Sequence, residues 1–82
     1  MGKAVLTLNP DYSRKLGKRV QELRLARGLT QEQLAARLQV CGCDLTRSAL
    51  AKVECAQRHL YPDELRVLTL ALHVSWEDLM PE

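Results

Sequence analysis

A short segment in the middle of the chain carries side chains whose chemistry suits the edges of DNA bases. The segment TRSALAKVE, residues 46–54, has apolar residues at Leu50 and Val53, which face a core if the segment is helical. The residues then left on its other side are Arg47, Ser48, Ala51 and Lys52. Arginine can donate two hydrogen bonds to guanine, serine donates or accepts, lysine meets guanine or phosphate, and alanine touches a thymine methyl. The same set would also make an ordinary solvated face, so the pattern alone leaves both interpretations open.

The distribution of charge favours a polyanion as the ligand of this region. Residues 1–59 hold eleven Lys and Arg against five Asp and Glu, whereas residues 60–82 hold one against five. We therefore expect the basic part to approach nucleic acid and the acidic end to face away from it.

Other reactive residues do not form a convincing catalytic or metal-binding pattern. Cys41, Cys43, Cys55 and His59 could in principle bind zinc, but the Cys-x-Cys spacing is tighter than the usual two-residue gap. A redox switch between Cys41 and Cys43 would close a strained loop. No nucleophile elbow, phosphate loop or carboxylate pair is present. We expect reduced thiols, no metal or other cofactor, and no enzymatic activity.

The rest of the sequence predicts one all-α domain that positions residues 46–54. Eighty-two residues support one core, apolar residues recur at helical spacing, and β-branched residues are too sparse for a sheet. The chain has neither an apolar run long enough to cross a membrane nor the apolar segment of a secretory signal, so we expect a cytoplasmic protein. Residues 1–11 are expected to form a loosely attached arm, and residues 12–82 the folded domain.

Five helices are expected, and capping residues mark where most of them begin. The first covers about 12–27 with a Leu16, Val20, Leu23 stripe, and Gly28 ends it. Thr30 begins the second, with Gln33 completing a capping box, and Thr46 begins the third after a turn at 40–45. Pro62 suits the first turn of the fourth helix, and Ser75 caps the fifth with Asp78 as partner. The buried residues expected on the fourth helix are Leu65, Leu68, Ala71 and Leu72.

These elements together resemble the phage repressor and Cro type of helix-turn-helix protein, the XRE-like family. The resemblance runs from Leu16 to Leu79 through LGKRVQELRLARGLTQEQLAARL, TRSALAKVE and LTLALHVSWEDL. It implies a five-helix fold in which residues 46–54 lie in the DNA major groove. It also implies that Arg24 and Glu54 form a buried structural ion pair. The positions that it assigns to base or phosphate contacts are Gln31, Thr46, Arg47, Ser48, Lys52 and Arg58.

Two features depart from the family pattern. Twelve residue steps separate Leu38 from Leu50, so the turn is longer than usual, and Gln39 replaces the common turn glycine. We expect Gly42 to supply the corner with positive φ instead. Cys55 and Ala56 replace the polar residue and glycine that commonly follow the glutamate, which weakens the case for a backbone phosphate contact there.

The sequence also predicts how the domain assembles. Once the fourth helix buries its core residues, Val67 and Leu70 are displaced toward solvent, and Trp76 joins them. We expect these three residues to form a two-fold dimer interface that serves a palindromic DNA site; the alternative is a larger intramolecular core around Trp76. The predicted function is a sequence-specific transcriptional regulator of repressor type. The alternative is an interaction module that binds a partner protein, as an antitoxin does.

Overall fold

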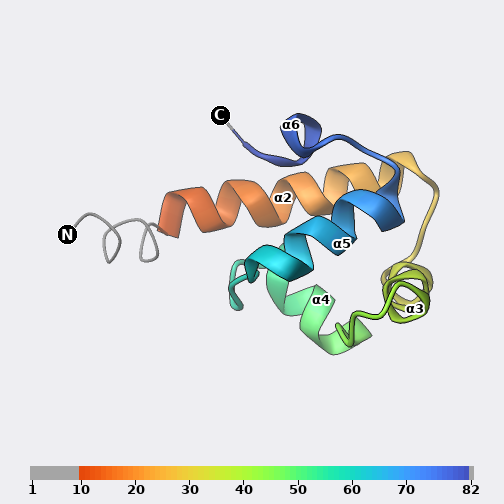
Figure 1. Ribbon diagram of the computed structural model, residues 1–82. Helices are drawn as coiled ribbons and strands as arrows, with labels where there is room; N and C mark the ends of the chain where they lie inside the picture. Colours follow the sequence, from red (N-terminus) through yellow and green to blue (C-terminus); the bar gives the residue numbers. More distant parts are fainter. Residues whose placement is uncertain (1–9, 82) are drawn as a thin grey trace.

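The computed structural model describes residues 10–81, and within them the chain forms five helices and no strands (Figure 1). The helices are α2 (Pro10–Ala26), α3 (Gln31–Val40), α4 (Arg47–Glu54), α5 (Pro62–Leu72) and α6 (Trp76–Leu79). The predicted all-α class is confirmed, and α2 begins two residues before the expected Tyr12. Residues 1–9 of the predicted arm lie outside the described residues.

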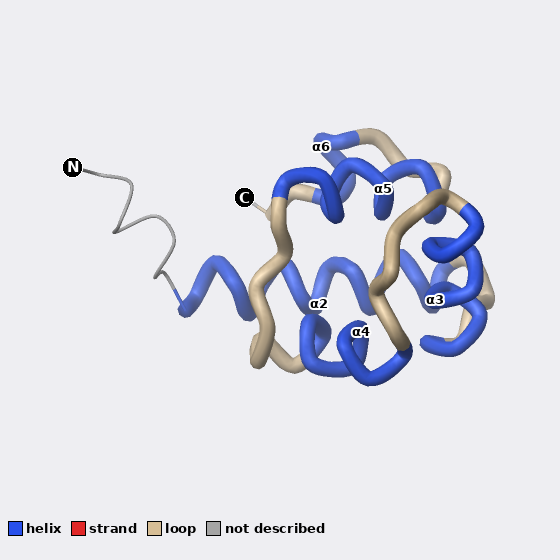
Figure 2. Tube along the Cα trace, turned by 60° about the horizontal axis from the view of Figure 1, so that its bottom comes forward, coloured by secondary structure: helices blue, strands red, loops and turns tan. Residues whose placement is uncertain are grey.

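The long helix α2 is the central element of the domain, and the other helices pack against it or against one another. Helices α4 and α6 pack against α2, while α3 packs against both α4 and α5. Figure 1 shows α4 and α6 on opposite sides of α2, and Figure 2 shows that both ends of α4 continue into loops. The side chains that are fully buried in the centre are Val20, Leu34, Leu38, Leu50, Leu68, Leu72 and Leu79. The leucine-rich core therefore holds α4 in place through the buried side chain of Leu50.

Two glycines end helices where the chain must turn sharply. Gly28 has φ of 70° and donates its N–H to Leu25 O over 2.9 Å, while the next N–H reaches back to Arg24 O. Gly42, with φ of 88°, ends α3 through the same pair of hydrogen bonds to Gln39 O and Leu38 O. Such endings need left-handed backbone, which glycine adopts without steric cost. The predicted roles of both glycines are confirmed.

Arginine side chains hold the end of α5 to the rest of the domain. Arg27 donates from Nε to Leu72 O over 2.7 Å and from a terminal nitrogen to His73 O over 2.9 Å. Arg37 on α3 donates to Ala71 O over 3.3 Å. The last carbonyls of a helix lack partners within it and carry partial negative charge, so cations stabilise them. The two arginines thus fasten the end of α5 to α3 and to the chain just after α2.

Candidate nucleic-acid interface

Helices α3 and α4 both begin at a threonine that satisfies free backbone N–H groups. Thr30 Oγ1 accepts from Gln33 N over 3.0 Å, and Gln33 Oε1 accepts from Thr30 N over 2.9 Å, so the predicted capping box is confirmed. Thr46 Oγ1 accepts from Ala49 N over 3.1 Å at the start of α4. Caps of this kind contribute about 1 kcal/mol each, so they fix where the two helices start.

Helix α4 has one buried face and one exposed face. Leu50 is fully buried and Val53 is 2% exposed. On the other side of the helix, Arg47, Ser48 and Lys52 are exposed, whereas Ala51 is half-buried. The structure therefore brings the predicted base-reading residues together on one exposed helical face. Thr46 is also exposed, with its hydroxyl already accepting the capping hydrogen bond.

The lengthened turn between α3 and α4 is anchored in the core. After the corner at Gly42, Cys43 is 7% exposed and Leu45 is 4% exposed, and both belong to the central hydrophobic cluster. The extra residues thus add two buried side chains and do not form a free loop. Sequence reasoning missed this anchor, although the alternation of apolar Cys43 and Leu45 around Asp44 signals a half-buried extended segment.

A shallow hollow of about 440 Å³ lies between α3 and the start of α4. Its polar lining includes two carboxylates, Glu32 and Asp44, beside Arg47 and Gln39. Carboxylates repel phosphate, whereas a carboxylate at a base edge can accept from the cytosine amino group. Whether the carboxylates beside Arg47 repel or attract DNA therefore depends on whether a phosphate or a base edge approaches them.

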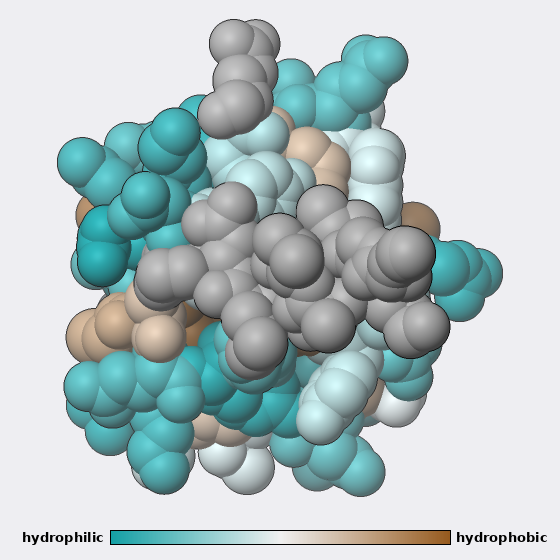
Figure 3. Space-filling model, turned by 90° about the vertical axis from the view of Figure 1, so that its left-hand side faces the viewer, coloured by the Kyte–Doolittle hydropathy of each residue, from teal (hydrophilic) through white to brown (hydrophobic). Residues whose placement is uncertain are grey.

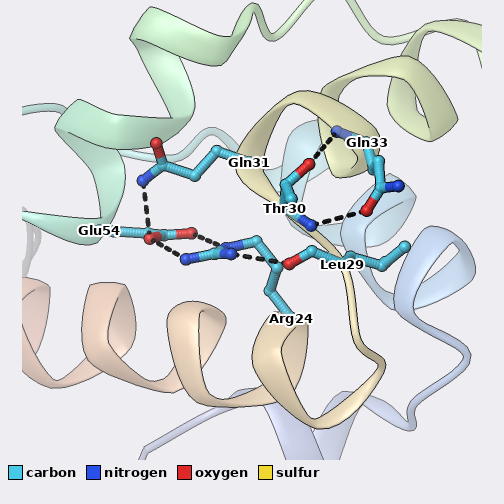
Figure 4. Close-up of polar contacts among 6 residues, drawn as sticks. All are labelled: Arg24, Leu29, Thr30, Gln31, Gln33 and Glu54. Atoms are coloured by element: carbon cyan, nitrogen blue, oxygen red, sulfur yellow. Dashed lines mark hydrogen bonds and ion pairs between the residues drawn. The ribbon is translucent and has the colours of Figure 1, made fainter.

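A buried carboxylate joins α2, α3 and α4 behind this surface (Figure 4). Arg24 Nε donates to Glu54 Oε2 over 2.8 Å, and a terminal nitrogen of Arg24 donates to Oε1 over 3.1 Å. The Arg24 side chain is 8% exposed and that of Glu54 is 2% exposed, so the predicted ion pair is present and buried. Arg24 also donates to Leu29 O over 2.7 Å, and Gln31 Nε2 donates to Glu54 Oε1 over 3.0 Å. Sequence reasoning missed the role of Gln31 in this cluster.

A close backbone approach brings α2 against the end of α4. Gly17 is buried, and a Cβ atom at this position would overlap the Val53 carbonyl oxygen and lie 3.2 Å from Glu54 O. No larger residue fits without moving the helices apart. The sequence analysis gave no role to Gly17, but a glycine in the middle of a helical pattern is the available signal.

Arg58 lies just after α4 and forms an ion pair with Glu64. Its two terminal nitrogens donate to Glu64 Oε1 over 3.0 Å and Oε2 over 2.9 Å, and its guanidinium carbon lies 5.9 Å from the centre of the Tyr61 ring. The hydrogen bonds with Glu64 raise the pKa of Arg58, and those from Arg58 lower the pKa of Glu64. A phosphate that contacts Arg58 must therefore share it with Glu64.

The cysteines are free thiols, with Cys41 and Cys55 exposed and Cys43 buried. Among residues 10–81, no group of three or more His, Cys, Asp or Glu side chains is arranged to hold a metal ion. No helix in the same part of the chain is long and apolar enough to cross a membrane.

The three residues predicted to form a dimer interface differ in exposure. Leu70 is 55% exposed and Trp76 is 50% exposed, whereas Val67 is half-buried and packs against the core. A different face of the molecule, at the beginning of α2, is mostly hydrophilic where described residues form it (Figure 3). Two large apolar side chains, one on α5 and one on α6, are thus half exposed in the single chain.

Comparisons with known proteins agree with this architecture. A family model described as a helix-turn-helix domain matches residues 15–82. The chain is also similar to the restriction-modification controller protein C.AhdI from Aeromonas hydrophila, whose crystal structure superimposes with a TM-score of 0.76. The two sequences are 34% identical, and the match covers 87% of this chain and 96% of that one. A search of curated proteins gives no match.

The family match covers most of the chain and includes both α3 and α4. The structural relative is similar along nearly its whole length and is named as a controller. In helix-turn-helix proteins, the second helix of the motif is the one that lies in the DNA major groove. The chain therefore belongs to the helix-turn-helix family and is a DNA-binding transcriptional regulator of the XRE-like type.

Proposed function

We propose that α4 enters the DNA major groove and reads the sequence with its exposed face. The observation that carries this proposal is the division of α4 between fully buried Leu50 and exposed Arg47, Ser48 and Lys52. The major groove is about 12 Å wide and accepts one helix. Arg47 and Lys52 contact guanine edges or nearby phosphates, Ser48 supplies an adaptable hydroxyl, and Ala51 permits close approach or touches a thymine methyl.

Flanking residues hold the DNA backbone in this proposal. Gln31 lies at the first residue of α3, where the positive end of the helix favours a phosphate. Thr46 begins α4, and Arg58 follows its end, so the two lie at opposite ends of the reading helix. Phosphate contacts fix the register of the protein on the duplex, while base contacts select the sequence. The work of the protein is then binding without catalysis, in the cytoplasm where the DNA lies.

The active form in this proposal is a homodimer on a palindromic site. Exposed Leu70 and Trp76, with the edge of Val67, supply apolar area that a second copy covers. They lie on α5 and α6 and not on α4, so pairing through them uses residues other than those proposed to read bases. Two-fold symmetry then requires half-sites whose centres are about one DNA turn, ~34–36 Å, apart.

The likeness to a restriction-modification controller supports a specific biological role. We place this chain in the same role, as a regulator of the genes of a restriction-modification system, because the two proteins correspond over 96% of the relative's length. Repression or activation then depends on where its sites lie relative to a promoter.

Selection of bound duplexes from random DNA, carried out at two salt concentrations, tests the proposal. The expected result is a palindromic consensus whose binding falls steeply with salt, because basic residues displace counterions from phosphates. Arg47→Ala should weaken binding to the selected duplex and flatten the preference at one position in each half-site. Uniform, sequence-independent retention would contradict specific reading and favour a module that binds a partner protein.

A further inference from the structure

The lengthened turn before α4 holds the carboxylate of Asp44 at the surface. Cys43 and Leu45, on either side of it, are 7% and 4% exposed, whereas Asp44 itself is exposed. The N–H of Cys43 also donates to Leu38 O over 2.8 Å, and Thr46, which caps α4, directly follows Leu45. Because both neighbours are buried in the core, the chain at Asp44 has little freedom to move. The turn therefore presents a fixed carboxylate next to the residues proposed to read bases.

Asp44 and Arg47 line the same hollow, between α3 and the start of α4. Within residues 10–81, neither side chain takes part in a hydrogen bond or an ion pair. A hydrogen-bond acceptor and a donor thus both lie there without a protein partner. A phosphate can use the donor alone, whereas the major-groove edge of a base pair presents both donors and acceptors. The two side chains together therefore match a base-pair edge better than the DNA backbone.

A carboxylate can distinguish among the four bases. Ionised aspartate only accepts hydrogen bonds. In the major groove, amino donors occur only at cytosine N4 and adenine N6, and adenine carries the acceptor N7 beside its amino group. A carboxylate that approaches adenine, guanine or thymine therefore meets an acceptor that repels it. Cytosine is the base that offers an amino donor with no acceptor on its own major-groove edge.

We infer that Asp44 is a specificity-determining residue, whose carboxylate accepts a hydrogen bond from cytosine N4 while Arg47 donates to a nearby guanine. This inference rests on the proposed function, because it assumes that α4 lies in the major groove. The same negative charge repels phosphates, so DNA without cytosine at this position is bound less tightly than it would be in the absence of Asp44. Asp44 thus raises the affinity for the correct site and lowers the affinity for other DNA.

The first test repeats the selection from random duplexes with Asp44→Asn. Asparagine has nearly the same shape as aspartate, but its amide pairs with N6 and N7 of adenine. We expect the variant to select adenine in place of cytosine at one position in each half-site, with the other positions unchanged. A residue that only supported the fold would not change the identity of a selected base.

The second test measures dissociation constants for Asp44→Ala, which removes the base contact and the repulsion together. The probes are the duplex selected by the parent chain and a random-sequence duplex of the same length. Loss of the contact weakens binding to the selected duplex about tenfold, and loss of the repulsion strengthens binding to any duplex about threefold. We therefore expect about threefold weaker binding to the selected duplex and about threefold tighter binding to the random one. A damaged fold would weaken both.

Glu77→Gln is the matched control, because it also exchanges an exposed carboxylate for an amide, but on α6. It should leave the selected sequence and the ratio of the two dissociation constants unchanged. Since the Asp44 side chain has no partner within residues 10–81, Asp44→Asn should unfold at the midpoint of the parent. A fall in Tm of more than about 4 °C would show that the carboxylate serves the fold, and it would overturn the inference.

The remaining outcomes separate this inference from the proposed function. If Asp44→Asn selects the parent's consensus, or if Asp44→Ala binds both duplexes more tightly by the same factor, Asp44 only repels phosphate and reads no base. Specific reading by Arg47 would then still stand. A parent chain that binds the selected and random duplexes equally well would overturn the proposed function itself.

Discussion

Replacing Gly17 with alanine should separate the first helix from the end of the reading helix. The added Cβ would overlap the Val53 carbonyl oxygen and lie 3.2 Å from Glu54 O, and both atoms belong to the backbone. Restoring an ordinary contact near 3.5 Å requires a shift of about 1 Å. Overpacking of this kind costs about 3 kcal/mol, and the better helix propensity of alanine offsets about 1 kcal/mol. We therefore expect a net loss of about 2 kcal/mol.

A loss of that size is measurable by thermal unfolding followed by circular dichroism. For a domain of this length, each kcal/mol moves the midpoint by about 4–8 °C, so Gly17→Ala should lower Tm by about 8–16 °C. The shift should also weaken binding to the selected duplex, because Glu54 anchors α4. Lys18→Ala, at the exposed neighbouring residue, is the matched control and should change Tm little. A Gly17→Ala variant as stable as the parent would refute the close approach of α2 to α4.

Three further predictions follow from other contacts. Ala56, two residues after the end of α4, has φ of 60°, so Ala56→Gly should raise stability by about 0.5–1 kcal/mol. The control Ala36→Gly on the exposed face of α3 should lower stability by a similar amount. Arg58 lowers the pKa of Glu64 from its ordinary 4.5, so this group stabilises the fold above that pH, and the stabilisation is lost as pH falls through the lower folded-state pKa. The difference in unfolding free energy between the parent and Glu64→Gln should therefore be constant near neutral pH and shrink below about 4.5; a difference that does not change with pH would contradict the role of the ion pair. Trp76→Ala should shift the sedimentation coefficient from that of a dimer toward that of a monomer, while the control Leu25→Ala, at another exposed apolar residue, should not. A parent chain that is monomeric, or a Trp76→Ala variant that remains a dimer, would contradict the proposed interface.

Features that depend on neighbouring residues could be predicted from the sequence. The capping box of Thr30 with Gln33, the one of Ser75 with Asp78, and the turn at Gly28 each involve residues only a few positions apart. Local backbone geometry decides such contacts, so short patterns are sufficient to find them. The division of α4 into two faces was predictable for the same reason, because helical periodicity alone determines it.

Contacts between distant residues required either the family resemblance or the structure. The Arg24–Glu54 pair spans thirty positions and was predicted only through the resemblance. The pairing of Arg58 with Glu64 was missed, since many acidic residues in the chain could equally have met Arg58. Gly17 was missed because the need for a small residue arises only from the distance between two packed helices. The burial of Cys43 was missed because a turn is usually expected at the surface.

The arginines at the end of α5 have a consequence for the kind of operator that the protein can use. Arg27, just after α2, and Arg37 on α3 donate to backbone carbonyls at the end of α5, so hydrogen bonds tie a helix proposed to face DNA to the helix that carries part of the surface proposed for pairing. The separation of the two reading helices is then set by the folded protein. Inserting one base pair between half-sites moves one of them by about 3.4 Å and rotates it by about 35° around the duplex. We therefore expect the protein to bind an operator with this altered spacing almost as weakly as an operator in which one half-site is scrambled.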